Sequence, residues 1–338
     1  MKGVVFPGRR SLELGDFPDP SPEAGEVVIR VMASGMCGSD LHQYRSAEPP
    51  TCIVGHEPSG VVEAVGVGVS PRLARVGDRV TVHHYAGCTV CDECRSGWYQ
   101  LCREGAVRYG ADAHGSHAPY MVVPAVTLVR LPESLSFETG AALGCGTGTA
   151  WGALRRLGHL AGADLVVSGQ GPVGLSATMI ASAIGARVIA VDVEASRLKM
   201  ARDFGAAEVV NPREAPVNET VRELTGGVGA SLVLETSGAP QAGTAALASL
   251  ATWGRACFVG LGGGAFEVDV TALLRTQVTI MTSWTLSISD LARCVDFADR
   301  YSLPVDRLFT DRWRLEEAAA AYAAFDQQRS GKGVFLFQ

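Results

Sequence analysis

The chain has 338 residues and a net charge of −6, and 47% of its residues are hydrophobic while 19% are charged. This length predicts two globular domains, each large enough to bury its own core, and the composition excludes a disordered chain. The acidic balance, without a basic patch, argues against nucleic acid and anionic membrane surfaces as partners. Because no apolar run reaches the length of a membrane-spanning helix and the first residues do not have the pattern of a signal peptide, we expect a cytoplasmic protein.

Residues 1 to about 140 are predicted to form a compact, irregular, mostly antiparallel β domain. Apolar, β-branched segments at 26–33, 60–65 and 78–82 are separated by clusters of Gly, Pro, Ser and Asp. Short strand-like segments divided by turn residues are typical of such a domain.

Two stretches of this domain concentrate the ligand types that Zn²⁺ prefers. The segment 36–42 offers a thiol, a hydroxyl, a carboxylate and an imidazole, from Cys37, Ser39, Asp40 and His42. The segment 55–57 adds His56 and Glu57. A catalytic zinc usually has three protein ligands and one open position. Taken alone, however, a Cys followed by a distant His is a weak signal, because a free Cys is more often a small buried hydrophobe.

A second cluster contains four of the nine cysteines within fifteen residues, with the spacing C-x2-C-x2-C-x7-C, at Cys88, Cys91, Cys94 and Cys102. Such crowding suits a metal better than disulfides in a reducing compartment. Four thiolates form a closed tetrahedral set, which predicts a structural Zn²⁺ site. The alternatives are an iron–sulfur cluster, which also uses four Cys, and a lobe of unliganded thiols.

From residue 137 onward the pattern changes to alternating strands and helices. An Ala-, Gly- and Leu-rich segment at 137–157 is predicted to be mostly helical and carries Cys145. Strands are expected near 164–168, 187–191, 208–210, 231–234, 255–259 and 278–281. Helices are expected between them at 172–184, 194–204, 217–225 and 241–250. Six apolar strands alternating with helices predict βαβ units and the doubly wound parallel sheet of a dinucleotide-binding (Rossmann) fold.

The first turn of this sheet matches a dinucleotide fingerprint, Gly169-Gln170-Gly171-Pro172-Val173-Gly174, which follows a strand and opens a helix. Gly169 permits the tight turn, Gly171 lets a pyrophosphate approach, and Gly174 lets the helix pack on the strand. Asp192 ends the second strand, where a carboxylate can bind the adenosine ribose hydroxyls. The alternative for this turn is an ordinary loop with an N-capping Asp.

The C-terminal part is predicted to return to the first domain. It contains a helix through residue 301, a strand near 308–313, a helix over 315–327 and a last strand at 333–337. These elements do not extend the six-strand series. We therefore expect a catalytic domain of residues 1–146 and 285–338, with a nucleotide-binding domain of residues 147–284 inserted in it.

In order along the chain, the Cys-Gly-Ser-Asp-Leu-His segment, the Gly-His-Glu, the four-Cys lobe, Cys145 and the fingerprint resemble the zinc-dependent alcohol dehydrogenases of the medium-chain dehydrogenase/reductase superfamily. The resemblance covers essentially the whole chain. It implies a GroES-like catalytic domain, two zinc ions per chain, NAD as the cofactor, and a homodimer or homotetramer. It also implies that Cys37, His56 and Cys145 bind the catalytic zinc.

The resemblance implies further roles for single residues. Asp40 would orient the zinc-bound imidazole, and Glu57 would lie behind the metal, able to approach it. Ser39 and His42 would relay the proton released from the alcohol, and His is suited to this because it titrates near neutral pH. Four positions match residues near the cofactor: Thr149, Arg197, Gly260 and Leu261.

The implied reaction interconverts a small-molecule alcohol and its aldehyde or ketone by hydride transfer to NAD. The polar residues after Cys37 and the pair His83–His84 hint at a polyol or another functionalised secondary alcohol. The alternatives are an NADP-dependent carbonyl, quinone or enone reductase of the same superfamily and, last, a non-enzymatic zinc-binding protein. His83, His84 and Trp284 are candidates for the substrate cleft, whereas His114 and His117 are expected at the surface or cleft rim.

Overall fold

The computed structural model describes residues 1–262, 264–328 and 331–337. It contains two compact units, Met1–Gly148 with Ser287–Gln338, and Thr149–Leu286. The chain therefore leaves the first unit once and returns to it. None of the helices in the described residues is long and apolar enough to cross a membrane.

The first unit is built on a seven-stranded sheet of order β16-β17-β3-β4-β5-β9, with β8 also paired to β3. The strands of the whole unit are β1 (Lys2–Gly8), β2 (Ser11–Asp16), β3 (Glu26–Gly35), β4 (Glu57–Val65), β5 (Arg79–Val82), β6 (Tyr85–Ala86), β7 (Val107–Arg108), β8 (Tyr120–Pro124), β9 (Leu128–Arg130), β16 (Phe309–Trp313) and β17 (Lys332–Leu336). Its helices are α1 (Asp40–Arg45), α2 (Asp92–Arg95), α3 (Phe137–Leu143), α10 (Ile288–Arg300) and α11 (Ala318–Asp326), with short 3-10 helices η1 (Tyr99–Leu101), η2 (Ala125–Thr127), η3 (Val305–Leu308) and η4 (Leu315–Glu317). The strands pair antiparallel except for β16 and β17, so the mostly antiparallel β domain is confirmed.

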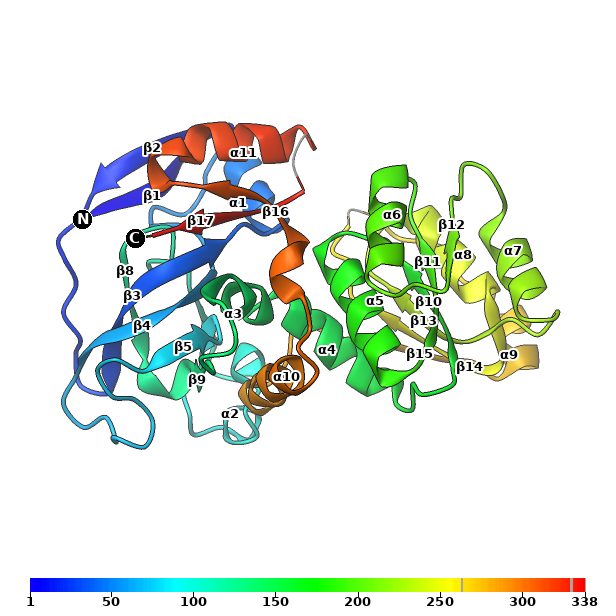
Figure 1. Ribbon diagram of the computed structural model, residues 1–338, viewed down its shortest axis with the longest axis horizontal. Coiled ribbons are helices and arrows are strands. Elements are labelled where there is room, and N and C mark those ends of the chain that lie inside the picture. Colours follow the sequence, from blue (N-terminus) through cyan, green and yellow to red (C-terminus); the bar gives the residue numbers. More distant parts are fainter. Residues whose placement is uncertain (263, 329–330, 338) are drawn as a thin grey trace. The chain divides into compact units, whose positions relative to one another are not determined.

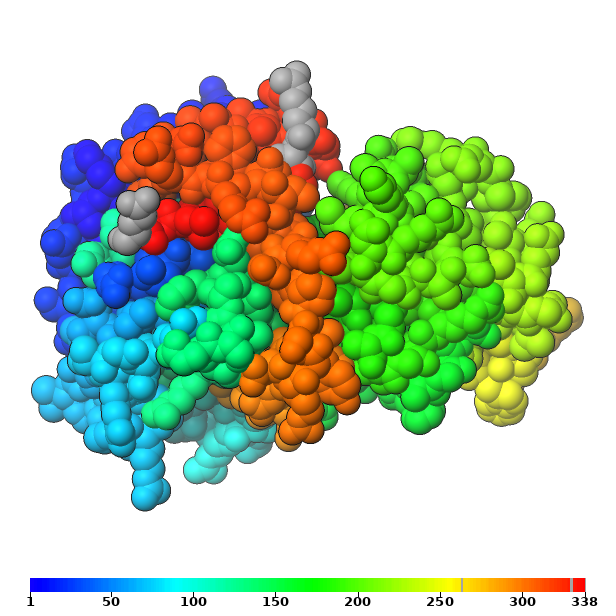
Figure 2. All heavy atoms as spheres, in the orientation of Figure 1, coloured from blue at the N-terminus to red at the C-terminus, as the bar shows by residue number. Residues whose placement is uncertain are grey.

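The returning segment completes the core of this unit. β17 pairs antiparallel with the end of β3, with Phe335 opposite Ser34. α11 lies over β1 and β2 in Figure 1, and the orange and red C-terminal segments cover the blue N-terminal ones in Figure 2. Phe6, Tyr44 and Tyr322 share one buried cluster between these segments. The C-terminal residues therefore pack against the loop that follows β3.

The second unit is a six-stranded sheet of order β12-β11-β10-β13-β14-β15, in which every pair is parallel. Its strands are β10 (Asp164–Ser168), β11 (Arg187–Val191), β12 (Glu208–Val210), β13 (Ala230–Glu235), β14 (Leu250–Phe258) and β15 (Thr279–Thr282). Its helices are α5 (Pro172–Ile184), α6 (Ala195–Asp203), α7 (Val217–Leu224), α8 (Pro240–Ala248) and α9 (Val270–Thr276), while α4 (Gly146–Leu157) begins in the first unit and continues into the second. The strand order reverses between β10 and β13, which confirms the doubly wound sheet.

Three local details differ from the sequence prediction. The predicted helix at 137–157 is interrupted at Gly144 and Cys145, between α3 and α4. A side chain at Gly144 would meet the Val82 carbonyl oxygen at 3.0 Å, so the chain passes close to β5 at this break. β14 begins at Leu250, earlier than expected, and α9 was not predicted. α9 has no buried residue, and without a buried apolar face it leaves no periodic signal.

Candidate active site

Three loops of the first unit bring Cys37, His56 and Cys145 together. Cys37 follows β3, His56 immediately precedes β4, and Cys145 occupies the break between α3 and α4. Cys37 Sγ lies 3.8 Å from Cys145 Sγ, and Cys145 Sγ lies 3.5 Å from His56 Nε2. With a carboxylate oxygen of Glu57, these ligand atoms all lie within 4.8 Å of one another.

This arrangement fits a zinc ion. Two sulfurs bound to one Zn²⁺ at about 2.3 Å with tetrahedral angles lie about 3.8 Å apart, and a sulfur and a nitrogen about 3.6 Å apart. The distances between the side chains of Cys37, Cys145 and His56 match these values. Glu57 Oε1 is buried without a hydrogen-bond partner, so a cation close to it would satisfy an otherwise orphaned acceptor.

Asp40 sets the orientation of His56. Its Oδ1 lies 2.9 Å from His56 Nδ1, and its Oδ2 accepts the Cys37 backbone N–H at 2.8 Å. A carboxylate can only accept, so Nδ1 donates a proton to Asp40 and Nε2 is the ring atom that faces Cys145. Burial lowers the pKa of His56, but the carboxylate of Asp40 and the sulfur of Cys37 outweigh that effect and hold it well above its usual value.

Lys332, which the sequence analysis did not single out, pairs with Glu57. Its Nζ lies 2.5 Å from Glu57 Oε2 and donates to the Met36 carbonyl at 3.1 Å. The two side chains are 2% and 0% exposed. Burial raises the pKa of Glu57 to about 7 although the Lys332 ammonium opposes the rise. No local pattern marks Lys332, because β17 brings it to Glu57 from 275 positions away.

Ser39 stands beside the ligand set and His42 lies further out. Ser39 Oγ donates to Cys37 Sγ at 3.2 Å and lies 3.4 Å from His56 Nε2. His42 is one turn along, on α1, and its side chain is exposed. A hydroxyl next to the candidate ligand atoms and an imidazole in solvent are the two ends that a proton relay requires.

The remaining histidines of this unit have different surroundings. His83 and His84 are buried, and the His84 ring centroid lies 4.9 Å from that of His56. Burial lowers the pKa of His84 well below its usual value, so the ring is neutral beside the ligand set. His114 is exposed, as expected, but His117 is fully buried. Its prediction as a surface or cleft-rim residue was wrong because its loop folds inward, where His117 Nε2 lies 2.8 Å from the hydroxyl of Tyr322 on α11.

The four-Cys lobe forms a second group of potential metal ligands. The ligand atoms of Cys88, Cys91, Cys94 and Cys102 all lie within 4.8 Å of one another. Cys88 Sγ accepts the backbone N–H of Cys91 at 3.3 Å, and Cys102 Sγ accepts that of Cys88 at 3.3 Å. Backbone donors aimed at sulfur stabilise thiolates, which are the form that binds a metal.

In the second unit, the fingerprint turn has the backbone that a dinucleotide site requires. Gly169 has φ +88°, in the left-handed region that favours glycine. A Cβ at Gly174 would lie 1.8 Å from the Gly169 carbonyl oxygen, so only glycine allows this packing of α5. A Cβ at Gly171 would meet nothing within 4 Å, so the space in front of the N-terminus of α5, where Pro172 and Val173 begin the helix, is open. A phosphate fits there because the first N–H groups of the helix are unpaired.

Asp192 follows β11 and is 7% exposed. Its Oδ2 accepts the Gln170 N–H at 2.6 Å and its Oδ1 accepts the Glu194 N–H at 2.9 Å, so the carboxylate ties the fingerprint turn to the start of α6. Arg197 approaches Oδ2 at 3.8 Å. A further cation that the sequence analysis missed, Arg213, lies 3.5 Å from Glu194 and donates to the Val193 carbonyl.

The other predicted cofactor residues also lie in this unit. Thr149 is half-buried on α4, and Leu261 is 73% exposed after β14. A Cβ at Gly260 would come within 2.1 Å of the Gly238 nitrogen, so the loops after β13 and β14 approach closely. Trp284, at the end of the same unit, is 48% exposed.

Comparison with known proteins supports the descriptions of both the first and the second unit. A profile for the alcohol dehydrogenase GroES-like domain matches residues 23–133, and one for zinc-binding dehydrogenases matches residues 172–300. A zinc-type alcohol dehydrogenase-like protein of Escherichia coli K12, YphC, is 36% identical over 355 residues, covering 100% of this chain and 99% of that protein. This chain belongs to the zinc-dependent alcohol dehydrogenase family.

Other members of the family extend the comparison. Sorbitol dehydrogenase of Bacillus subtilis is 32% identical over 330 residues, covering 95% of this chain and 92% of that enzyme. The solved structure of the alcohol dehydrogenase RspB of E. coli CFT073, in complex with NADH, superimposes with a TM-score of 0.92 at 26% identity, covering 100% and 99% of the two chains. The prediction of a zinc-type alcohol dehydrogenase with zinc and NAD as its typical cofactors is thereby confirmed.

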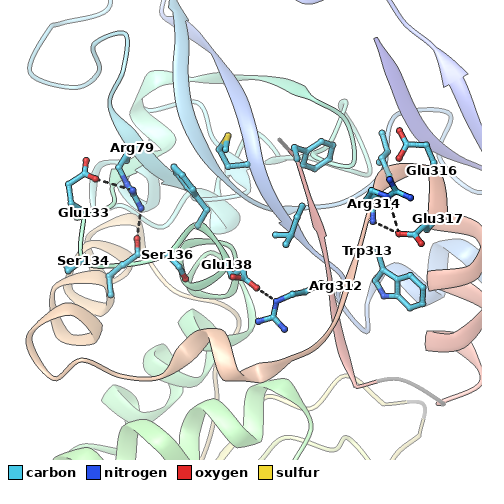
Figure 3. A pocket seen from close by; sticks show the side chains of 16 residues that line it. Arg79, Glu133, Ser134, Ser136, Glu138, Arg312, Trp313, Arg314, Glu316 and Glu317 are labelled. Atoms are coloured by element: carbon cyan, nitrogen blue, oxygen red, sulfur yellow. Dashed lines mark hydrogen bonds and ion pairs between the residues drawn. The ribbon is translucent and has the colours of Figure 1, made fainter.

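The first unit of this alcohol dehydrogenase also carries a groove of about 1080 Å³, shown in Figure 3. Ion pairs cross or edge it, between Arg312 and Glu138 at 2.6 Å and between Arg79 and Glu133 at 3.2 Å. Its described lining includes none of the Cys and His residues discussed above. The groove therefore belongs to the joint that ties β16 to α3 and is separate from the ligand set.

Proposed function

We propose that this protein interconverts a functionalised secondary alcohol, such as a polyol, and its carbonyl compound with NAD, using one catalytic and one structural zinc. The observation that carries the proposal is the convergence of Cys37, His56 and Cys145 at distances suited to tetrahedral zinc, 3.8 Å between the sulfurs and 3.5 Å from Cys145 Sγ to His56 Nε2. These residues would hold the catalytic zinc.

When bound, Zn²⁺ supplies a Lewis acid that lowers the pKa of a hydroxyl group, and NAD supplies the hydride acceptor. The residues of this chain would then manage the proton. Ser39 Oγ, 3.2 Å from Cys37 Sγ, is within reach of a hydroxyl held by the ligand set and can accept its proton. His42 is exposed on α1 and can pass that proton to solvent.

The substrate proposal rests on the polar neighbours of the ligand set and on the relative that is a sorbitol dehydrogenase. Metal-assayed protein should be screened by NADH absorbance against polyols, simple alcohols, aldehydes and ketones. We expect turnover with a polyol or a related secondary alcohol, and its loss in Cys145→Ser. The absence of any NAD(H) turnover by protein that holds two zinc ions would contradict the proposal.

We propose that NAD is preferred over NADP. The Asp192 carboxylate, held by the Gln170 and Glu194 N–H groups, would accept ribose hydroxyls and repel a 2′-phosphate. The nearby cations are compensated, since Arg197 faces Asp192 and Arg213 faces Glu194. We expect at least about a tenfold preference in kcat/KM, or about 1.4 kcal/mol, and a smaller one in Asp192→Ala. Equal efficiency of the wild type with both cofactors would show that Asp192 does not read the ribose.

We propose that the four-Cys lobe holds the structural zinc. The close approach of its four thiol groups supports this, together with a buried Cys94 packed against Tyr85 and Tyr99. A closed set of four sulfurs leaves no position for a substrate, so such a site contributes to stability alone. Elemental analysis should give two zinc ions per chain, and one zinc with full activity would contradict the assignment.

We also propose a cytoplasmic homo-oligomer. The nine cysteines are free thiols, which favours a reducing compartment. β15 ends the strand order of the second unit, and on α9, which packs against the neighbouring strand β14, Val270 and Leu274 are each 64% exposed, which favours burial by another copy of the chain. Light scattering should give a mass of at least two 35.4 kDa chains, and a monomer would overturn the oligomer.

A further inference from the structure

A hydrogen-bond network of buried polar side chains extends from Asp40, on the side away from the ligand set. Tyr322 OH donates to Asp40 Oδ2 at 3.3 Å, and the same hydroxyl lies 2.8 Å from His117 Nε2. His117 Nδ1 lies 2.7 Å from Ser34 Oγ, which in turn lies 2.7 Å from Ser116 Oγ. The residues come from α1, α11, β3 and the loop before β8, so segments far apart in the sequence contribute to this hydrogen-bond network.

In this hydrogen-bond network, each donor is directed toward Asp40. A carboxylate only accepts, so the Tyr322 hydroxyl must donate its single proton to Asp40. Its oxygen is then left to accept from His117 Nε2–H, and His117 Nδ1 must accept from the Ser34 hydroxyl. Burial lowers the pKa of His117 to about 4, which agrees with a neutral ring in this single tautomer.

Because the network is buried, the loss of any one of its hydrogen bonds is costly. Ser34, Ser116, His117 and Tyr322 are all 0% exposed. A buried donor or acceptor without a partner costs about 1–3 kcal/mol. Gly55, the residue before His56, has φ +89°, and a Cβ there would lie 2.3 Å from His117 Nδ1. Backbone and side chains are therefore fitted together around the His117 ring.

We propose that Tyr322 and His117 are positioning residues for the catalytic metal, acting through Asp40. The inference rests on the proposed binding of zinc by His56. Two donors, the Cys37 N–H and the Tyr322 hydroxyl, occupy Asp40 Oδ2 and leave Oδ1 for His56 Nδ1. With its carboxylate so held, Asp40 keeps the His56 ring turned so that Nε2 faces the sulfur of Cys145.

The first test is zinc retention by Tyr322→Phe, with Tyr44→Phe as its matched control. The rings of Tyr44 and Tyr322 lie 5.5 Å apart in one cluster, so both substitutions remove a hydroxyl from the same packing, but only Tyr322 reaches Asp40. Each protein is equilibrated with increasing concentrations of a zinc chelator, and the zinc remaining per chain is measured. Loss of such a supporting partner typically weakens metal binding by about 10–100-fold.

We expect Tyr322→Phe to release one zinc at a chelator concentration at least about tenfold lower than the wild type, with the other zinc unaffected, and Tyr44→Phe to behave as the wild type. Identical curves for Tyr322→Phe and the wild type would overturn the inference, and so would equal losses in both variants, which would indicate loosened packing. A wild type that never binds the second zinc would refute the proposed function instead.

The second test uses His117, in case the Tyr322 variant does not fold. A Gln side chain can place an amide donor near the position of Nε2, whereas Leu cannot donate. His117→Leu should therefore weaken retention of the same zinc, and His117→Gln should restore most of it. Equal retention in both variants would show that the donor to Tyr322 is irrelevant to the metal.

Discussion

Mild acidification should lower the free energy of unfolding of this protein, and replacing His117 by Gln should make that decrease smaller. Burial lowers the pKa of His117 to about 4 in the folded state, against about 6.5 in an unfolded chain. Between these values the unfolded state binds a proton that the folded state does not. The free energy of unfolding therefore rises with pH across this window and falls as the pH drops from about 6.5 toward about 4.

The structure sets the magnitude of this effect. His117 is 0% exposed, and burial outweighs the Asp40 carboxylate, which alone would raise the pKa, while a charged His56 acts in the same direction as burial. The pKa difference corresponds to about 3 kcal/mol in total, of which about 2 kcal/mol is lost between pH 7 and pH 5.

Urea unfolding of the wild type and of His117→Gln, at pH 7 and pH 5 and at one zinc concentration, measures the contribution of His117 to the free energy of unfolding. The two proteins share every other titratable group, including the proposed zinc ligands, so those contributions cancel in the comparison. We expect the wild type to lose about 2 kcal/mol more than the variant between pH 7 and pH 5. Parallel losses would mean that His117 reaches solvent or is protonated in the folded protein.

Four further single substitutions separate the roles assigned to the first unit. Lys332→Met should destabilise it by about 3–5 kcal/mol because it leaves the buried Glu57 without its partner, and adding Glu57→Gln should recover most of the loss; an unchanged thermal melt for the single variant would contradict this. Ser39→Ala should lower the rate of hydride transfer with a normal melt, while His42→Gln should cost less and mainly at low pH, since solvent can replace the outermost group; a pH–rate profile unaffected by the His42 substitution would count against the relay. Cys94→Ser should release one zinc and lower the melting temperature, because a structural zinc contributes folding free energy, and an unchanged midpoint would argue against that role.

Local patterns in the sequence were sufficient for the architecture of the second unit. The strand at 164–168, the glycines of 169–174 and the helix at 172–184 were predicted with the bounds that the structure has. Each is defined by the periodicity of its own residues or by backbone angles that only glycine adopts easily. α9 escaped prediction for the same reason, because its exposed residues leave no such periodicity.

The candidate zinc ligands were also predicted from the sequence, the four-Cys lobe by its residue types and short spacing, and Cys37, His56 and Cys145 by the resemblance to the family. Their surroundings were not. Lys332 reaches Glu57 from 275 positions away and Tyr322 reaches Asp40 from 282, while His117, predicted at the surface or cleft rim, lies in the core. Such contacts depend on how β17 pairs with β3 and how α11 packs on the N-terminal strands. Residue type and spacing along the chain therefore determined which side chains can bind a metal, whereas long-range packing alone decided which buried groups hold them in place.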